Sequence, residues 1–121
     1  AVEAAIRVIH PQLSGMHGVI FTAPGQRGGD LRTATILSGG VLRRSPGVTG
    51  TIAVMSVLEA MGILGDVFIN EGLLGTSLVA TEVRRQMVNE RPIIVPLIES
   101  AVTITGIHEF LIEDRGPAFR I

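Results

Sequence analysis

The sequence predicts an α+β domain in which a mixed or largely antiparallel sheet wraps around one central apolar helix. Most of the chain consists of short β-type runs separated by glycine and proline breaks. One stretch, residues 49–63, instead carries apolar side chains at helical spacing. Apolar residues make up 46% and charged residues 17% of the 121 positions, which is the composition of a single globular domain. Strands that do not alternate regularly with helices favour α+β over a doubly wound fold.

Two strands are expected in the N-terminal part of the chain, at residues 17–23 and 31–37. Each is followed by a glycine-containing break, and the Gly-rich residues 26–30 between them are expected to form a loop. Residues 1–9 have the pattern of the end of a helix. His10-Pro11 then forces an extended or turn conformation, because the residue before a proline avoids the helical region.

The predicted helix follows the turn Ser45-Pro46-Gly47. Ile52 and Met55 fall on one side of it, but small and apolar residues occur all around the helix and leave little polar surface. We therefore expect a helix over residues 49–63 that is covered on most sides.

The second half of the chain reads as one strand after another. The run that contains Pro92 and Pro96 is expected to be bent or to lie at an edge of the sheet, because proline cannot donate to a central ladder. Arg84 and Arg85 are interpreted as the solvated end of a strand. The expected strands are residues 67–70, 76–85, 92–98, 101–107 and 109–114.

Composition excludes several classes of function. A net charge of −1 gives no electrostatic case for binding nucleic acid or an anionic membrane surface. The chain has no cysteine, so it carries no thiolate, disulfide or cysteine metal site of its own. All ten basic residues are arginine, so no lysine can form a Schiff base. No run of about 18 apolar residues occurs, and we expect a cytoplasmic protein.

The start of the predicted helix is a candidate anion site. Gly47 precedes it, Thr49 and Thr51 lie in its first turn, and the first backbone N–H groups of a helix have no intrahelical partner. The alternative is ordinary capping, in which Thr49 or Thr51 satisfies those N–H groups itself. Local sequence leaves both interpretations open.

The other polar candidates are interpreted as structural. Glu71 follows an apolar strand and is expected to be a solvated strand-end carboxylate, and Asp30 is expected to form at most a local pair with Arg32. The histidines do not have the spacing of metal ligands, and no metal site is expected. They are His10, His17 and His108.

Six blocks of sequence cover nearly the whole chain: HPQLSGMHGVIFTAP, GGDLRTATILSGG, RRSPGVTGTIAV, LGDVFINEGLLGTSL, RPIIVPLI and ITGIHEFLIED. In this order and at these spacings they resemble the C-terminal half of the proline racemase family, which includes hydroxyproline epimerases and trans-3-hydroxyproline dehydratases. The resemblance rests on several independent blocks rather than on one motif.

This resemblance implies two similar domains facing each other across a cleft, a fold shared with diaminopimelate epimerase. Residues 1–121 would be the second domain, with the first domain absent from this chain. The family uses neither cofactor nor metal: one cysteine from each domain flanks the α-carbon of proline, and the two exchange its proton. The resemblance also implies that backbone amides at a helix start hold the substrate carboxylate, here those of Val48, Thr49 and Gly50.

Three positions depart from the family pattern. Gly47 stands where the second catalytic cysteine is expected, or Thr or Ser in the dehydratases, and Val48 stands where a glycine is usual. Arg43 stands where the family usually has an aspartate that pairs with the ring ammonium of the substrate. Thr49, Gly50 and Thr51 match the pattern.

These departures predict an isomerase-family domain that is inactive as a racemase on its own. Glycine has no group that can accept or donate a proton, and Arg43 would repel the ammonium of a zwitterionic imino acid. One alternative is part of a one-base dehydratase. Another is a non-catalytic domain that binds a small carboxylate with the help of Arg43 and Arg44. In every case we expect the domain to pair with a sister domain or a second copy, as a dimer.

Overall fold

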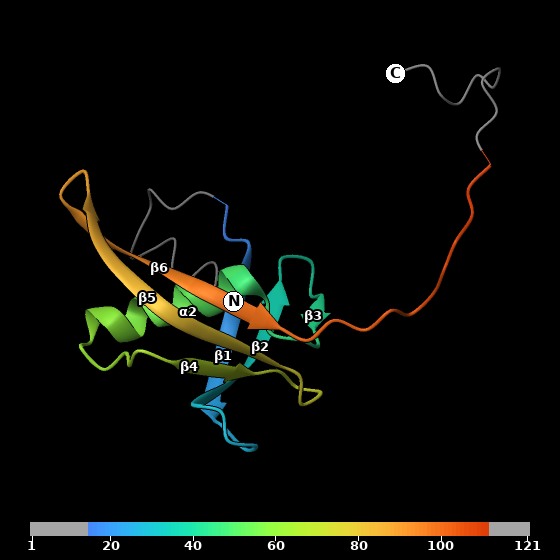
Figure 1. Ribbon diagram of the computed structural model, residues 1–121, viewed down its shortest axis with the longest axis horizontal. Coiled ribbons are helices and arrows are strands. Elements are labelled where there is room, and N and C mark those ends of the chain that lie inside the picture. Colours follow the sequence, from blue (N-terminus) through green and yellow to red (C-terminus); the bar gives the residue numbers. More distant parts are fainter. Residues whose placement is uncertain (1–14, 112–121) are drawn as a thin grey trace.

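The computed structural model describes residues 15–111, which form one helix and a six-stranded sheet (Figure 1). The predicted helix at residues 1–9, His10, and the last residues of the run 109–114 lie outside this range. In chain order the elements are β1 (Gly18–Pro24), β2 (Leu31–Leu37), β3 (Leu42–Arg43), α2 (Val48–Ala60), β4 (Phe68–Glu71), β5 (Ser77–Val88) and β6 (Arg91–Ser100).

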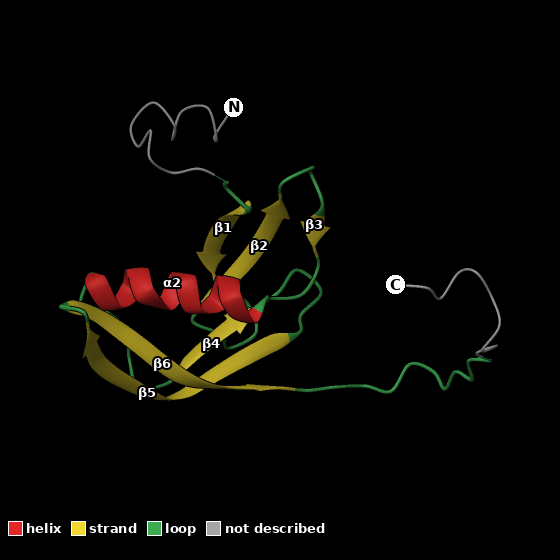
Figure 2. Ribbon diagram, turned by 90° about the horizontal axis from the view of Figure 1, so that it is seen from above, coloured by secondary structure: helices red, strands yellow, loops and turns green. Residues whose placement is uncertain are grey.

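The sheet is mixed, as predicted. Its strand order is β1-β2-β4-β5-β6, with the short β3 paired to β2. β2 and β4 are parallel and every other pair is antiparallel. The parallel pair arises because α2 carries the chain across between these two strands. Figure 2 shows α2 lying along the inner side of the curled sheet.

The core lies between α2 and the inner face of this sheet. Val54 and Met55 of the helix pack against Phe68 of β4 and Ala80 of β5. The opposite side of the helix is open, and Val57 and the adjoining Met61 are 59% and 63% exposed. The expectation that the helix is covered on most sides is therefore wrong for the described part of the chain, because the sheet reaches only one side of it.

The helix is also shorter at its C-terminal end than predicted. It begins at Val48 and ends at Ala60, not at Ile63. Gly62 has φ of +71°, and its N–H donates to the Glu59 carbonyl at 2.9 Å. The N–H of Ile63 donates to the Leu58 carbonyl at 3.0 Å. This pair of bonds is the Schellman motif, in which a glycine in the left-handed region ends the helix.

β5 and β6 form a long hairpin. Asn89 and Glu90 connect the strands with φ of +49° and +62°, as in a two-residue type I′ turn. β6 carries Pro92 and Pro96 and lies at one end of the strand order, so its prediction as an edge strand is confirmed. The described residues contain no helix long and apolar enough to cross a membrane.

Two predictions about strands are wrong. Residues 101–107 and 109–111 form no strand and are exposed throughout, although their sequence is of β type. The reason is that no strand of the described chain lies beside them, and an isolated extended segment has no ladder. The opposite error concerns β3, which the sequence did not reveal, since two residues are too few for a periodic pattern.

Candidate anion-binding site at the start of helix α2

The first turn of α2 presents unpaired backbone donors. Gly47 is the N-cap residue, and the first intrahelical bond joins the Thr51 N–H to the Gly47 carbonyl at 2.8 Å. The amides of Val48, Thr49 and Gly50 precede this bond and therefore have no partner within the helix. Among residues 15–111 no side chain caps the helix, and its first turn holds no acidic residue. The N–H groups and the positive end of the helix dipole are thus both available to an anion.

Thr51 does not cap the helix and has another role. It is fully buried, and its Oγ1 accepts a hydrogen bond from Asn70 Nδ2 at 2.8 Å. Asn70 Oδ1 in turn accepts from the Thr33 hydroxyl at 2.9 Å. This buried chain of three side chains fixes the first turn of α2 to β4 and β2. The capping interpretation is therefore wrong, and Asn70 is a supporting residue that sequence reasoning did not identify.

The two glycines of this turn differ in what surrounds them. A Cβ at Gly50 would lie 3.2 Å from Ile20 Cδ1, so Gly50 allows the helix to lie close to β1. A Cβ at Gly47 would meet nothing within 4 Å, and its φ of −91° is open to any residue. The backbone therefore does not require glycine at position 47. There is room for a side chain at this position.

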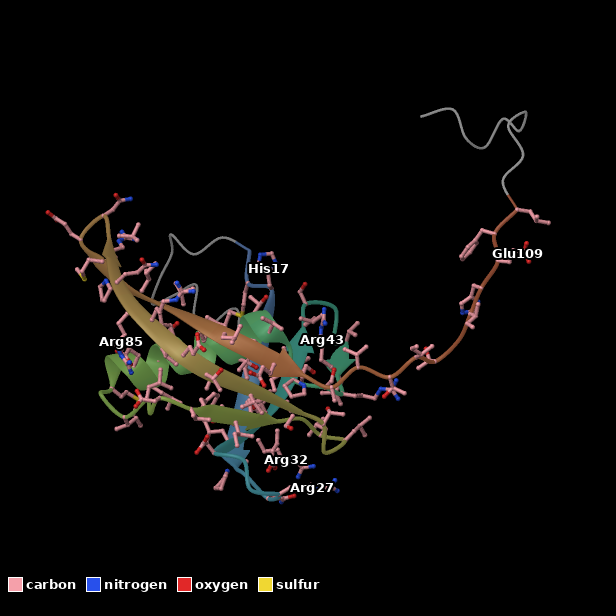
Figure 3. All side chains as sticks on the ribbon, viewed as in Figure 1. His17, Arg27, Arg32, Arg43, Arg85 and Glu109 are labelled. Carbon is pink, nitrogen blue, oxygen red and sulfur yellow. The ribbon has the colours of Figure 1, made fainter. Side chains whose placement is uncertain are left out.

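Two arginines stand close to this helix start in the chain. Arg43 ends β3 opposite Thr35 of β2, and Arg44 follows it in the loop that leads to α2. Both are exposed. Figure 3 shows Arg43 beside that loop, whereas Arg85 lies at the other end of α2.

Glu71 is not a solvated strand end, and that prediction is wrong. It is 4% exposed, and its carboxylate accepts three backbone hydrogen bonds from the loop after β1. The donors are the N–H groups of Gln26 at 2.8 Å, Arg27 at 2.7 Å and Gly29 at 2.7 Å. The bonds from Gln26 and Gly29 lower the pKa of Glu71 most, and partial loss of hydration opposes them.

The expected pair between Asp30 and Arg32 is also replaced by other contacts. Asp30 Oδ2 accepts from the Ile69 N–H at 2.7 Å. Arg32 donates to the Gln26 side-chain oxygen at 2.8 Å and to the Leu73 carbonyl at 3.0 Å. Both residues thus hold the loop after β1 close to β4 and to the residues that follow it. They contact these partners instead of each other.

Gly72 connects this loop to the start of α2. A Cβ on Gly72 would lie 2.5 Å from Pro46 Cδ and 3.0 Å from Pro46 N. The backbone after β4 therefore packs directly on the turn that precedes the helix. Contacts therefore run from the loop after β1 through Glu71 and Gly72 to Pro46, which lies just before the helix.

The remaining polar features lie elsewhere. Among residues 15–111 no three His, Asp or Glu side chains gather as metal ligands, and His17 and His108 are exposed. A cavity of about 610 Å³ lies at the C-terminal end of α2, next to the β5–β6 hairpin. Arg85 donates there to Glu59 at 2.7 Å in an exposed ion pair.

The described residues thus form a mixed, curled sheet with one helix packed on it, and the first amides of that helix have no partner within the helix. A family profile described as proline racemase matches residues 1–120. The chain belongs to the proline racemase family.

Similar proteins include enzymes of two named activities. The chain is 36% identical to a 4-hydroxyproline 2-epimerase of Streptosporangium roseum over 114 residues, which are 90% of this chain and 34% of that protein. It is 32% identical to a trans-3-hydroxy-L-proline dehydratase of Bacillus cereus over 120 residues, which are 94% of this chain and 36% of the other. The chain thus spans about a third of the length of these relatives.

Solved structures show the same fold. A hydroxyproline epimerase of Agrobacterium vitis with bound trans-4-hydroxy-L-proline superposes with a TM-score of 0.72 at 27% identity, covering 88% of this chain and 34% of that one. A probable proline racemase of Agrobacterium radiobacter K84 with bound carbonate gives 0.70 at 28% identity, covering 89% and 32%. The predicted fold class, of the diaminopimelate epimerase type, is confirmed.

Proposed function

We propose that the start of α2 binds the carboxylate of a small imino acid or a related acid, and that the domain does not racemise it. The observation that carries the proposal is the set of amides at Val48, Thr49 and Gly50 that have no partner in the helix, in a first turn that holds no acidic residue. Two solved relatives hold trans-4-hydroxy-L-proline and carbonate, so anions of this kind suit the family. Backbone donors at a helix start stabilise such groups without a metal or cofactor.

The chemistry of Gly47 argues against racemisation. Inversion at an α-carbon needs a base on one face and an acid on the other, and glycine supplies neither. Arg43 adds a positive charge at the position where the family usually has an aspartate that pairs with the ring ammonium of proline. Repulsion between like charges therefore favours acids whose nitrogen is not cationic.

A one-base dehydratase is the second candidate. Its support is the similarity to the Bacillus cereus dehydratase. Such an enzyme needs one thiolate to remove the α-proton, and a sister domain would have to supply it, because this chain has no cysteine. In this proposal residues 1–121 act as the second domain of a cytoplasmic, cofactor-independent protein, or pair with a second copy.

Hydrogen exchange at the substrate α-carbon tests the proposed loss of racemisation. In D₂O with L-proline or trans-4-hydroxy-L-proline, we expect the chain to give no α-deuteration by NMR and no epimer by chiral chromatography. The triple variant Arg43→Asp, Gly47→Cys, Val48→Gly should give detectable α-deuteration, because a thiolate then faces the α-carbon. Ser45→Cys, which places a thiol two residues away, should not. Epimer formation by the unmodified chain would contradict the proposal.

A further inference from the structure

Three buried polar side chains hold the start of α2 from inside the domain. Thr51 lies on the first turn of the helix, Asn70 on β4 and Thr33 on β2, and each is at most 5% exposed. Asn70 Nδ2 donates to Thr51 Oγ1 at 2.8 Å, and the Thr33 hydroxyl donates to Asn70 Oδ1 at 2.9 Å. Asn70 thus links the helix to both strands of the parallel pair.

This cluster fixes a direction as well as a contact. Burying an amide and two hydroxyls costs free energy, and the hydrogen bonds between them return only a modest net gain. Apolar side chains of the same shape would therefore hold a helix against a sheet about as well. Hydrogen bonds weaken steeply when their geometry changes, so they define the orientation of the first turn more sharply than packing does.

The start of α2 depends on such an anchor because its N-cap residue cannot provide one. Helix ends fray, and an ordinary N-cap side chain limits the fraying by accepting from the amides of the first turn. Gly47 has no side chain and cannot cap in this way. A cap would also occupy the donors that an anion needs, whereas Asn70 holds the turn through Thr51 Oγ1 and leaves those donors unoccupied.

Close packing on the sheet acts together with this anchor. A Cβ at Gly50 would lie 3.2 Å from Ile20 Cδ1, so the same turn lies directly against β1. Donors that are ordered before a ligand arrives bind it without a further loss of conformational freedom. We propose that Asn70 is the positioning residue of the carboxylate site and holds the N–H groups of Val48, Thr49 and Gly50 in the arrangement that binds the anion. This inference rests on the proposed function.

Thr51→Val and Thr51→Ser test the positioning role. Valine has the shape of threonine but no acceptor for the Asn70 amide, whereas serine keeps the acceptor. By ¹⁵N relaxation without ligand, we expect the order parameters of the Val48, Thr49 and Gly50 amides to fall from about 0.85 to below about 0.6 in Thr51→Val only. The affinity for acetate, measured from saturable amide shifts, should fall about tenfold in Thr51→Val and less than about twofold in Thr51→Ser.

A triple variant removes the cluster without leaving a buried donor unpaired. Thr33→Val, Asn70→Leu and Thr51→Val together replace both hydrogen bonds with apolar contacts, which is close to neutral for stability. The triple variant should keep its circular dichroism and melt within about 5 °C of the unmodified chain, yet bind acetate about tenfold more weakly. Ser56→Ala is the control: it removes a side-chain bond to the Ile52 carbonyl within the same helix, and acetate affinity should not change.

The outcomes separate this inference from the proposed function. An unmodified chain that binds no acetate would contradict the proposed function and this inference with it. If the unmodified chain binds acetate, then full affinity or fully ordered helix-start amides in Thr51→Val and in the triple variant would overturn the positioning role alone. An equal loss of affinity in Thr51→Ser and Thr51→Val would also overturn it, because the bond from Asn70 would not be the cause.

Discussion

Glu71→Gln should lower the stability of this domain more than any other single replacement of a charged side chain. Both carboxylate oxygens accept backbone N–H groups, Oε1 from Arg27 and Gly29 and Oε2 from Gln26. A glutamine keeps only one of these acceptors and turns an NH₂ group toward a donor. Charge-assisted bonds are lost together, and a partly buried N–H loses its acceptor. We expect the Tm to fall by roughly 10 °C in thermal melts followed by circular dichroism.

Glu59→Gln is the matched control for this substitution. Glu59 also accepts two hydrogen bonds, from Arg85 at 2.7 and 3.0 Å, but the pair is exposed to solvent. Exposed ion pairs contribute little, because water and salt screen them. The Tm of the Glu59→Gln variant should change by no more than about 2 °C. Equal losses in the two variants would show that the loop after β1 does not depend on Glu71.

The same carboxylate should make stability depend on pH. Hydrogen bonds from the loop amides lower the pKa of Glu71 in the folded state. Its contribution is then complete above the unfolded pKa of about 4.3 and is lost as the pH falls through the lower folded pKa. The difference in Tm between the unmodified chain and Glu71→Gln should therefore be constant above about pH 5.5 and shrink toward pH 3. A difference that grows on acidification would contradict this sign.

Gly72→Ala should disturb the candidate site without touching it. The added Cβ would lie 2.5 Å from Pro46 Cδ and 3.1 Å from the Arg44 carbonyl oxygen. Neither atom belongs to a flexible side chain, so the turn before α2 has to move. Overpacking of this kind costs about 1–3 kcal/mol. Because the same turn places the amides of the helix start, we also expect affinity for a carboxylate to fall at least tenfold in calorimetric titration.

Gly47→Ala is the control for that variant. It adds the same methyl group on the other side of Pro46, where nothing lies within 4 Å, and its backbone conformation suits alanine. Stability should change by less than about 1 kcal/mol, because the smaller freedom of alanine in the unfolded chain offsets its weaker preference for the N-cap position. If Gly47→Ala destabilised the domain as much as Gly72→Ala, the packing described between Gly72 and Pro46 would not be the cause.

The sequence predicted those parts of the fold that local signals define. β2 has the predicted bounds because glycine-rich segments flank an alternating run on both sides. The end of α2 was placed three residues late, since two glycines, Gly62 and Gly65, could each have ended the helix. The prediction of a strand at residues 101–107 was wrong, because a strand depends on a neighbouring strand as well as on its own residues.

The site was less predictable because its supports come from distant parts of the chain. Glu71 lies 42 to 45 residues away in sequence from the N–H groups that donate hydrogen bonds to it. Asn70 lies 37 residues from Thr33, whose hydroxyl donates to it. No local pattern distinguishes such a carboxylate from a solvated one. The open space at Gly47 and the tight contact at Gly72 likewise depend on tertiary packing. The open amides of α2 were foreseeable, because every helix start has them and only their cap was in question.

The most direct test of the central claim is a titration followed by amide NMR. Acetate is added to the ¹⁵N-labelled chain, with sodium chloride at equal ionic strength as the control. We predict saturable shifts of the Val48, Thr49 and Gly50 amides, larger for acetate than for chloride. Shifts that fail to saturate, or that centre on Ala60 and Met87 beside the cavity at the other end of α2, would contradict it.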